Sequence, residues 1–324
     1  MRRSAWRAAR VLVSLALVIF VVKTTDLPGF ARALGDLDAI SVGAALLLTL
    51  VTPLLGIVRF RRVLGLAGAK APFWPLLVDL LIATAYNFVL PTSLGGDVVR
   101  AARTGRRLGS TGLAIAAVGY ERVVGLLVLS LCGWLGALWL TRIDPVVLLA
   151  VSASTLLLAG FSAGWVGPLL AVLSRSARLP AAIRIVLLDV ARLFRGPFSG
   201  ARPLLDTALG SLAYQLTNLG ILAVVAMTFP DLDWGRAVFL GVPLALVLSS
   251  VPISIGGLGL RESLFVTILG FYGVDRERAL LLSLIWLGST LLLGALGVLA
   301  MLFEELVDDP ERAAHDTKRT VPGA

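Results

Sequence analysis

Cysteine and histidine are almost absent from this chain of 324 residues, which has one of each, Cys132 and His315. A single cysteine excludes an intramolecular disulfide, and without Cys or His clusters there is no soft-metal site to propose. The sequence also lacks a GxxxxGK[ST] phosphate-binding motif and any nucleophile paired with a base. We therefore expect no cofactor, no metal and no catalytic residue, and we interpret the chain as a non-enzyme.

Charge is scarce as well, at 15% of residues, while 58% are hydrophobic and the mean hydropathy is +0.92. A soluble domain has roughly half apolar and a quarter charged residues. The apolar runs are continuous rather than alternating, which favours transmembrane helices over a barrel. We predict an all-α polytopic membrane protein. The net charge of +9 fits lysine and arginine collecting in cytoplasmic loops, and no nucleic-acid-binding motif accompanies it, so no nucleic-acid partner is expected.

Apolar segments divide the chain into candidate membrane elements. They lie at about 9–25, 39–58, 76–90, 112–140, 146–170, 208–229, 237–251, 258–272 and 279–303. The first follows several arginines and no small-x-small cleavage site ends it, so we interpret it as a retained span with a cytoplasmic N-terminus. The segments at 76–90 and 237–251 have only about 15 residues, which is short for a full crossing at 1.5 Å per residue.

The positive-inside rule decides how the short segments run. If 76–90 crossed the membrane, the basic residues that follow it would lie outside; a re-entrant hairpin keeps them inside. These residues are Arg100, Arg103, Arg106 and Arg107, and the preceding loop with Arg59, Arg61, Arg62 and Lys70 is placed inside too. The resulting prediction is about six full spans plus two re-entrant helical hairpins, with both termini cytoplasmic.

The two halves of this arrangement have the same order of elements in opposite orientation. Repeat one covers about 1–144 and repeat two about 145–303, which predicts an inverted-topology repeat, a common plan among secondary transporters. The remaining residues, 304–324, form a polar cytoplasmic tail that we expect to be disordered. Within repeat two, residues 180–206 show helical spacing of apolar and basic side chains. This segment is either an amphipathic helix on the inner leaflet or an ordinary basic connector.

Both short segments end in the same motif, "LPTSLGGDVVR" at 90–100 and "VPISIGGLGLRE" at 251–262. The matching pairs are Pro91 with Pro252, Ser93 with Ser254, Gly95 with Gly256, Gly96 with Gly257, and Arg100 with Arg261. Proline ends a helix, and paired glycines allow close backbone approach. A helix that starts after them presents free N–H groups to an anion, and an arginine one turn later can grip a phosphate. Alternatively, these are tight loops whose arginines reach the lipid headgroups.

Glu121 and Arg122 lie near the middle of segment 112–140, where an unpaired charge is costly. Adjacent helix positions point about 100° apart, so each residue needs its own partner. Arg122 can meet Asp97 or Asp79, and Glu121 can meet Arg100 or Arg261. Glu262, directly after Arg261, repeats the local combination of charges. We expect either a structural salt-bridge network or a site for a phosphate or a proton.

The motifs "NFVLPTSLGGDVVRA", "YERVVGL" and "PISIGGLGLRE", in this order, resemble the lysylphosphatidylglycerol synthase transmembrane (flippase-like) family over about residues 5–305. The resemblance implies a membrane domain that handles lipids, similar to the flippase domain of the multiple peptide resistance factor. The chain has no region matching that protein's soluble synthase domain, so lipid aminoacylation is not expected. The motif residues carried over are Pro91, Gly95, Gly96, Asp97, Arg100, Glu121, Arg122, Gly256, Gly257, Arg261 and Glu262.

The favoured hypothesis is a flippase that moves an anionic phospholipid, aminoacyl-lipid, glycolipid or polyprenyl-phosphate-linked lipid. Its headgroup would lie between the two hairpin tips, bound by Arg100 and Arg261. The alternatives are a non-transporting membrane partner of a cell-envelope glycosyltransferase or lipid-modifying enzyme, and a transporter of a small soluble solute. Ala, Arg and Gly-rich usage is typical of a GC-rich bacterial genome, so we expect a bacterial cytoplasmic membrane. The lipid, the direction, the energy source and the oligomeric state stay open.

Overall fold

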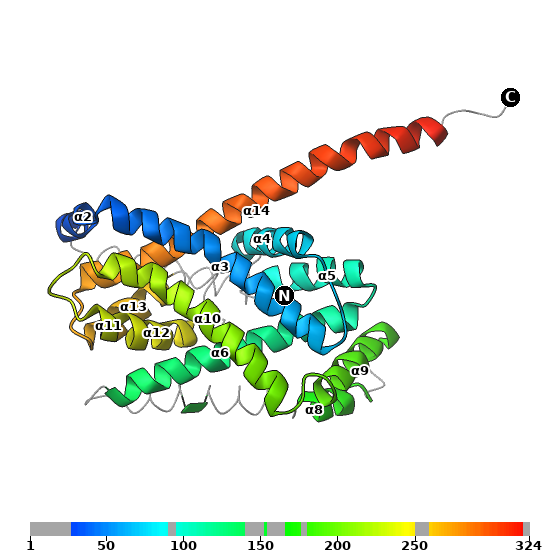
Figure 1. Ribbon diagram of the computed structural model, residues 1–324, viewed down its shortest axis with the longest axis horizontal. Helices are drawn as coiled ribbons and strands as arrows, with labels where there is room; N and C mark the ends of the chain where they lie inside the picture. The colour runs from blue at the N-terminus through cyan, green and yellow to red at the C-terminus, as the bar shows by residue number, and fades with distance from the viewer. Residues whose placement is uncertain are drawn as a thin grey trace, which may run out of the picture.

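The computed structural model describes residues 27–89, 95–139, 152–153, 166–175, 180–249 and 259–319, and the regular structure in these ranges is helical (Figure 1). The predicted segment at 9–25 and most of 146–170 lie outside the described residues. So do several predicted site residues, namely Pro91, Ser93, Pro252, Ser254, Gly256 and Gly257.

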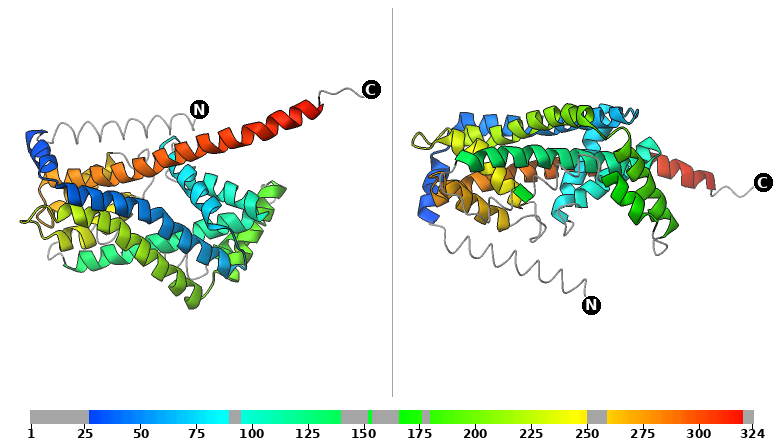
Figure 2. Two further views of the ribbon diagram at one scale, coloured as in Figure 1. Left: turned by 45° about the horizontal axis from the view of Figure 1, so that its top comes forward. Right: turned by 90° about the horizontal axis from the view of Figure 1, so that it is seen from below.

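Four of the described helices are long and apolar enough to cross a membrane. They are α3 (Ala39–Leu66), α6 (Thr111–Trp139), α10 (Ala201–Ala226) and the apolar part, Arg276–Glu304, of α14 (Arg276–Arg319). Helices α3 and α10 run antiparallel and side by side, because Gly220 lies against Leu48 and Gly210 against Arg59 (Figures 1 and 2). The described part of the chain is therefore all-helical, and the protein is a multi-pass membrane protein.

The first short segment forms a helical hairpin with the helix that follows it. Helices α4 (Phe73–Val89) and α5 (Gly95–Leu108) are antiparallel. Near its open end, the Asp79 carboxylate of α4 accepts hydrogen bonds from Arg103 and Arg107 of α5. Near its tip, the backbone N–H of Gly96 donates to Asn87 at 2.8 Å. At 1.5 Å per residue, neither helix exceeds about 26 Å in length.

A second hairpin occupies the corresponding place in the other half of the chain. It consists of α11 (Trp234–Arg236), the π-helix η2 (Ala237–Gly241), α12 (Val242–Ser249) and α13 (Leu260–Gly270). Gly241 lies directly against Leu269 and Tyr272, so the start of the hairpin is next to its end. Gly133 lets α6 come close to the backbone of Pro243 and Leu244, which packs the hairpin onto α6.

Two apolar clusters hold the bundle together. One joins α10, the second hairpin and the start of α14, with Leu222, Phe229 and Phe265 fully buried. The other joins α3, α4, α6 and α9 (Ala181–Arg195), with Phe60, Tyr120 and Phe198 at its centre. Most other apolar side chains on the long helices are exposed, including Leu47, Leu135 and Leu299, as expected for helices that face lipid.

The two ends of the bundle differ in charge. The end formed by the C-terminus of α3, the open end of α4–α5 and α9 carries arginines at 61, 62, 106, 107, 184, 192 and 195. The opposite end holds α2 (Leu27–Gly35) and the acidic residues Asp36, Asp38, Asp231, Asp233, Asp275 and Glu277. There a hydrogen bond from Arg278 holds the pKa of Asp231 below its ordinary value. We call them the basic end and the acidic end.

One expectation is wrong. Arg59 is not in a cytoplasmic loop, because α3 continues to Leu66 and buries Arg59 to 9% exposure. An ion pair with Glu121 on α6 explains how the charge of Arg59 is accommodated in the interior. Helix α14 extends through Arg319 and projects from the bundle (Figure 1), and the expected disorder of the tail at 304–324 stays a prediction.

Candidate functional site

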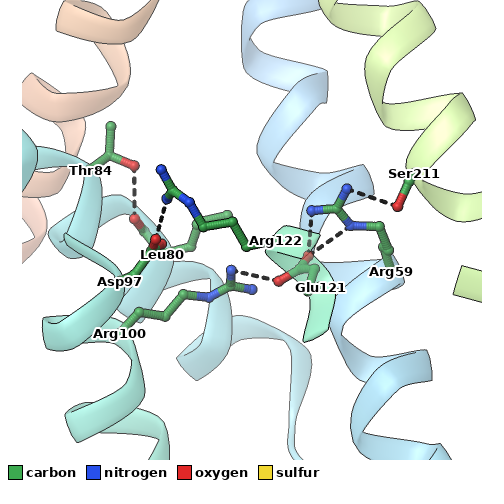
Figure 3. A network of polar contacts seen from close by, with 8 residues as sticks. All are labelled: Arg59, Leu80, Thr84, Asp97, Arg100, Glu121, Arg122 and Ser211. Atoms are coloured by element: carbon green, nitrogen blue, oxygen red, sulfur yellow. Dashed lines mark hydrogen bonds and ion pairs between the residues drawn. The ribbon is translucent and has the colours of Figure 1, made fainter. Parts of the chain in front are cut away.

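A buried cluster of charges lies between α3, α5 and α6 (Figure 3). At its centre the Glu121 carboxylate, 2% exposed, accepts bonds from two arginines. Arg59 Nε and Nη2 reach Oε1 at 2.8 and 2.7 Å, and Arg100 Nη1 reaches Oε2 at 2.8 Å. The expected pairing of Glu121 with Arg100 is confirmed. Because two guanidinium groups share one carboxylate, this triad carries one excess positive charge.

Arg100 is less completely bonded than its neighbour. Its side chain is 8% exposed, and its guanidinium lies over the Phe60 ring, 3.9 Å from the centroid. Nε and Nη2 of Arg100 are buried without a protein acceptor among the described residues. A guanidinium has five N–H groups and cannot lose its charge in a protein. Arg100 thus has donors in the interior that no described residue accepts from, close to the first turn of α5.

Arg59 is a site residue that the sequence analysis missed. All three of its nitrogens have acceptors, because Nη1 also reaches Ser211 Oγ of α10 at 3.3 Å. Its guanidinium lies 4.6 Å from the Tyr214 ring centroid, and its stem crosses Gly210. A signal was present in the sequence. The buried stripe of small residues at 45, 49, 52 and 56 of α3 continues at the same helical spacing to Arg59.

A second ion pair lies beside the triad. Arg122, the neighbour of Glu121 on α6, bonds to Asp97 on α5, which confirms that adjacent positions have different partners. Asp97 and Arg122 are 28% and 37% exposed, whereas the triad is almost fully buried. This pair is neutral, so it leaves the excess charge of the triad uncompensated.

The predicted glycines place the first turn of α5 close to the triad. Gly95 and Gly96 are both buried, and a Cβ atom on Gly96 would lie 2.2 Å from the Ala83 carbonyl oxygen and 2.6 Å from Asn87 Oδ1. Only glycine allows α5 to begin this close to α4. As a result, the positive end of the α5 dipole and Arg100, one turn further on, lie in the same part of the bundle.

Asp79 does not pair with Arg122 but links three helices at the basic end. It is fully buried and receives hydrogen bonds from Arg103 at 2.6 Å and Arg107 at 2.8 Å. Arg103 also donates to both oxygens of Glu304 on α14, at 2.7 and 2.9 Å. This group, Asp79, Arg103, Arg107 and Glu304, therefore joins the open end of the α4–α5 hairpin to α14.

The second hairpin tip has a different arrangement. Arg261 pairs with its own neighbour Glu262, which also accepts from the backbone N–H of Gly259 at 2.6 Å. Ser283 Oγ of α14 lies 3.5 Å from Glu262. The first tip meets α14 at Gly294, against Phe88. Ser283 and Gly294 are about 16 Å apart along the helix axis, so the two tips contact α14 at different levels.

Arg100 and Arg261 are consequently held by different carboxylates, Glu121 and Glu262. A pocket shared by both arginines stays a prediction. Among the described residues no group of three or more His, Cys, Asp or Glu side chains could hold a metal ion.

A multi-pass helical bundle with a buried, positively charged cluster between α3, α5 and α6 defines a membrane protein with a charged interior. The chain belongs to the family described as the lysylphosphatidylglycerol synthase TM region, whose model matches residues 7–297. The family resemblance noted in the sequence is thereby confirmed, and with it a membrane function related to lipids. No match was found among curated proteins or among solved structures.

Proposed function

We propose that this protein is a lipid flippase without an energy source of its own. It moves an anionic phospholipid, aminoacyl-lipid, glycolipid or polyprenyl-phosphate-linked lipid across the cytoplasmic membrane. The observation that carries the proposal is the Arg59–Glu121–Arg100 triad, a buried group with one excess positive charge. Two nitrogens of Arg100 have no acceptor in the part of the chain that the structure describes. A headgroup phosphate supplies both the missing charge and the missing acceptors.

The energetics favour a ligand over a purely structural role for the triad. Buried ion pairs contribute little to stability, because desolvation offsets the attraction between the charges. A second arginine on one carboxylate increases that cost, and each unsatisfied buried donor adds roughly 1–3 kcal/mol. These costs are recovered when a phosphate enters and accepts charge-assisted bonds from Arg100. The positive end of the α5 dipole also stabilises an anion at this place.

We infer that about six spans and two re-entrant hairpins form an inverted repeat, which rocks to expose the site to each leaflet in turn. Two observations support this topology. The α4–α5 hairpin opens at the basic end, where Asp79 meets Arg103 and Arg107. The α11–α13 hairpin opens at the acidic end, where Gly241 meets Tyr272. By the positive-inside rule the basic end is cytoplasmic, and so are both chain termini.

This topology predicts which residues a membrane-impermeant thiol reagent reaches. In a Cys132→Ala background, Arg106→Cys introduces a thiol at an exposed position of the basic end. This thiol should react only after the cells are permeabilised, so that the reagent reaches the cytoplasmic face of the membrane. Asp233→Cys, at the acidic end, should react in intact cells and serves as the matched control. Labelling of Arg106→Cys in intact cells would reject the re-entrant reading of α4–α5.

The function is tested with purified protein in liposomes that contain fluorescent lipids in both leaflets. Wild-type protein should increase the fraction of a fluorescent anionic lipid that an external reductant can bleach. A matched zwitterionic analogue and protein-free liposomes provide the controls. Arg261→Ala should lower the rate if the second tip also contacts the headgroup. If wild-type protein moves no lipid, the flippase proposal is wrong. A role as a membrane partner of a cell-envelope enzyme then becomes the better explanation.

A further inference from the structure

Helix α9 lies across the basic end of the bundle and uses one face to pack against it. Phe194 contacts the Tyr120 ring edge-on, with ring centroids 5.9 Å apart, and Val190 and Ala191 are buried. At the other side of this contact, Gly112 of α6 lies directly against Asp189. This inward face explains why α9 is fixed to α6. Among the described residues, the opposite face is contacted only at its end, where the stem of Arg195 lies against Gly167.

The outer face of α9 combines basic and apolar side chains. At 100° per residue, five residues fall on an arc of about 100° that points away from the bundle. They are Arg184, Ile185, Leu188, Arg192 and Arg195, all of them exposed. Ile185 is 60% and Leu188 39% exposed. The single acidic residue of the helix, Asp189, lies at the edge of this face and approaches Arg192 only at 3.5 Å.

Helix α8 (Val166–Leu173) extends the apolar part of this surface. It packs against α9 where Gly167 meets the backbone of Ala191 and the stem of Arg195. Leu169, Val172 and Leu173 of α8 are about half exposed. An exposed surface that is both apolar and basic is poorly suited to bulk water, whereas it matches the boundary between acyl chains and phosphate groups.

We propose that the outer face of α9 is a binding surface for anionic phospholipid headgroups at the membrane interface. Leu188 and Ile185 enter the acyl-chain boundary, and the three arginines bind headgroup phosphates. Charge complementarity identifies the occupant, because the face carries three cations against one carboxylate at its edge, Asp189, beside a leaflet surface that anionic lipids make negative. This surface is separate from the interior triad and does not depend on lipid transport.

The test places a fluorophore on the same face without removing any of its five residues. Ala181, exposed at the start of α9, is changed by Ala181→Cys in the Cys132→Ala background and labelled. In liposomes, brominated phosphatidylglycerol should quench the label more strongly than brominated phosphatidylcholine. The variant Arg184→Gln/Arg192→Gln/Arg195→Gln should lower this preference about fivefold or more, the order expected even for one arginine near an anionic surface.

The matched control is Arg61→Gln/Arg62→Gln/Arg106→Gln, which removes the same charge from exposed positions of the same end. This variant should keep the preference for the anionic lipid. An equal loss in both variants would show a general effect of net charge and overturn the proposal. The proposal would also be overturned if neither brominated lipid quenched the label. That result would indicate a water-facing surface for a soluble partner. Efficient cross-linking of Ala181→Cys between copies would instead assign the face to self-association.

Discussion

Glu121→Gln is expected to destabilise the protein more than any other single substitution in the charge cluster. The glutamine removes the carboxylate that Arg59 and Arg100 share, and it leaves two buried positive charges without an ion-pair partner among the described residues. Breaking a buried ion pair on one side costs roughly 3–5 kcal/mol. Thermal unfolding in detergent, followed by the loss of the monodisperse peak in size-exclusion chromatography, measures the effect.

Two further variants, Arg59→Gln and Glu304→Gln, should lower the unfolding temperature less than Glu121→Gln does. Arg59→Gln also breaks bonds to Glu121, but it leaves Arg100 and Glu121 as a neutral pair. It should therefore lower the unfolding temperature less than Glu121→Gln does. Glu304→Gln removes a carboxylate that is 37% exposed, and such a pair is worth roughly 1 kcal/mol or less. If Arg59→Gln were as damaging as Glu121→Gln, net buried charge would not govern the stability of the triad.

Residue pairing in the interior was predictable because a charge at membrane depth must find a partner. Few carboxylates lie in apolar segments of this chain, so the partners of Glu121 and Arg122 could be narrowed to two each. The structure selects Arg100 and Asp97. The long helices were predictable for a similar reason, since an apolar run near 20 residues leaves little other than a membrane span.

Arg59 shows where this reasoning fails. The positive-inside rule sums basic residues over a loop, and Arg59 stands close to Arg61 and Arg62 at the end of an apolar run. The three arginines point to different sides of α3, and the positive-inside rule does not take that direction into account. Arg59 follows the buried small-residue stripe of α3, whereas Arg61 and Arg62 point outward. Glu262 holds the arginine directly before it, Arg261, and the same carboxylate reaches back to Gly259 at the start of α13.

Arg100→Lys is expected to reduce the rate of lipid movement roughly tenfold to a hundredfold while leaving the fold intact. Lysine keeps the positive charge and one bond to Glu121, but its ammonium cannot bond Glu121 and a phosphate with the planar fork of a guanidinium. A lost hydrogen bond to a charged group is worth about 1.5–3 kcal/mol, which corresponds to that range of rates. The liposome assay with an anionic fluorescent lipid measures the rate, and chromatography confirms folding.

Arg59→Lys is the matched control for this substitution. Both arginines bond Glu121, but all three nitrogens of Arg59 have protein acceptors, whereas Nε and Nη2 of Arg100 have none among the described residues. If the unused donors of Arg100 bind the headgroup, Arg59→Lys should lower the unfolding temperature and change the transport rate by less than Arg100→Lys does. Equal rates in the two variants would mean that Arg100 only holds Glu121 in place, and the headgroup would have to bind elsewhere.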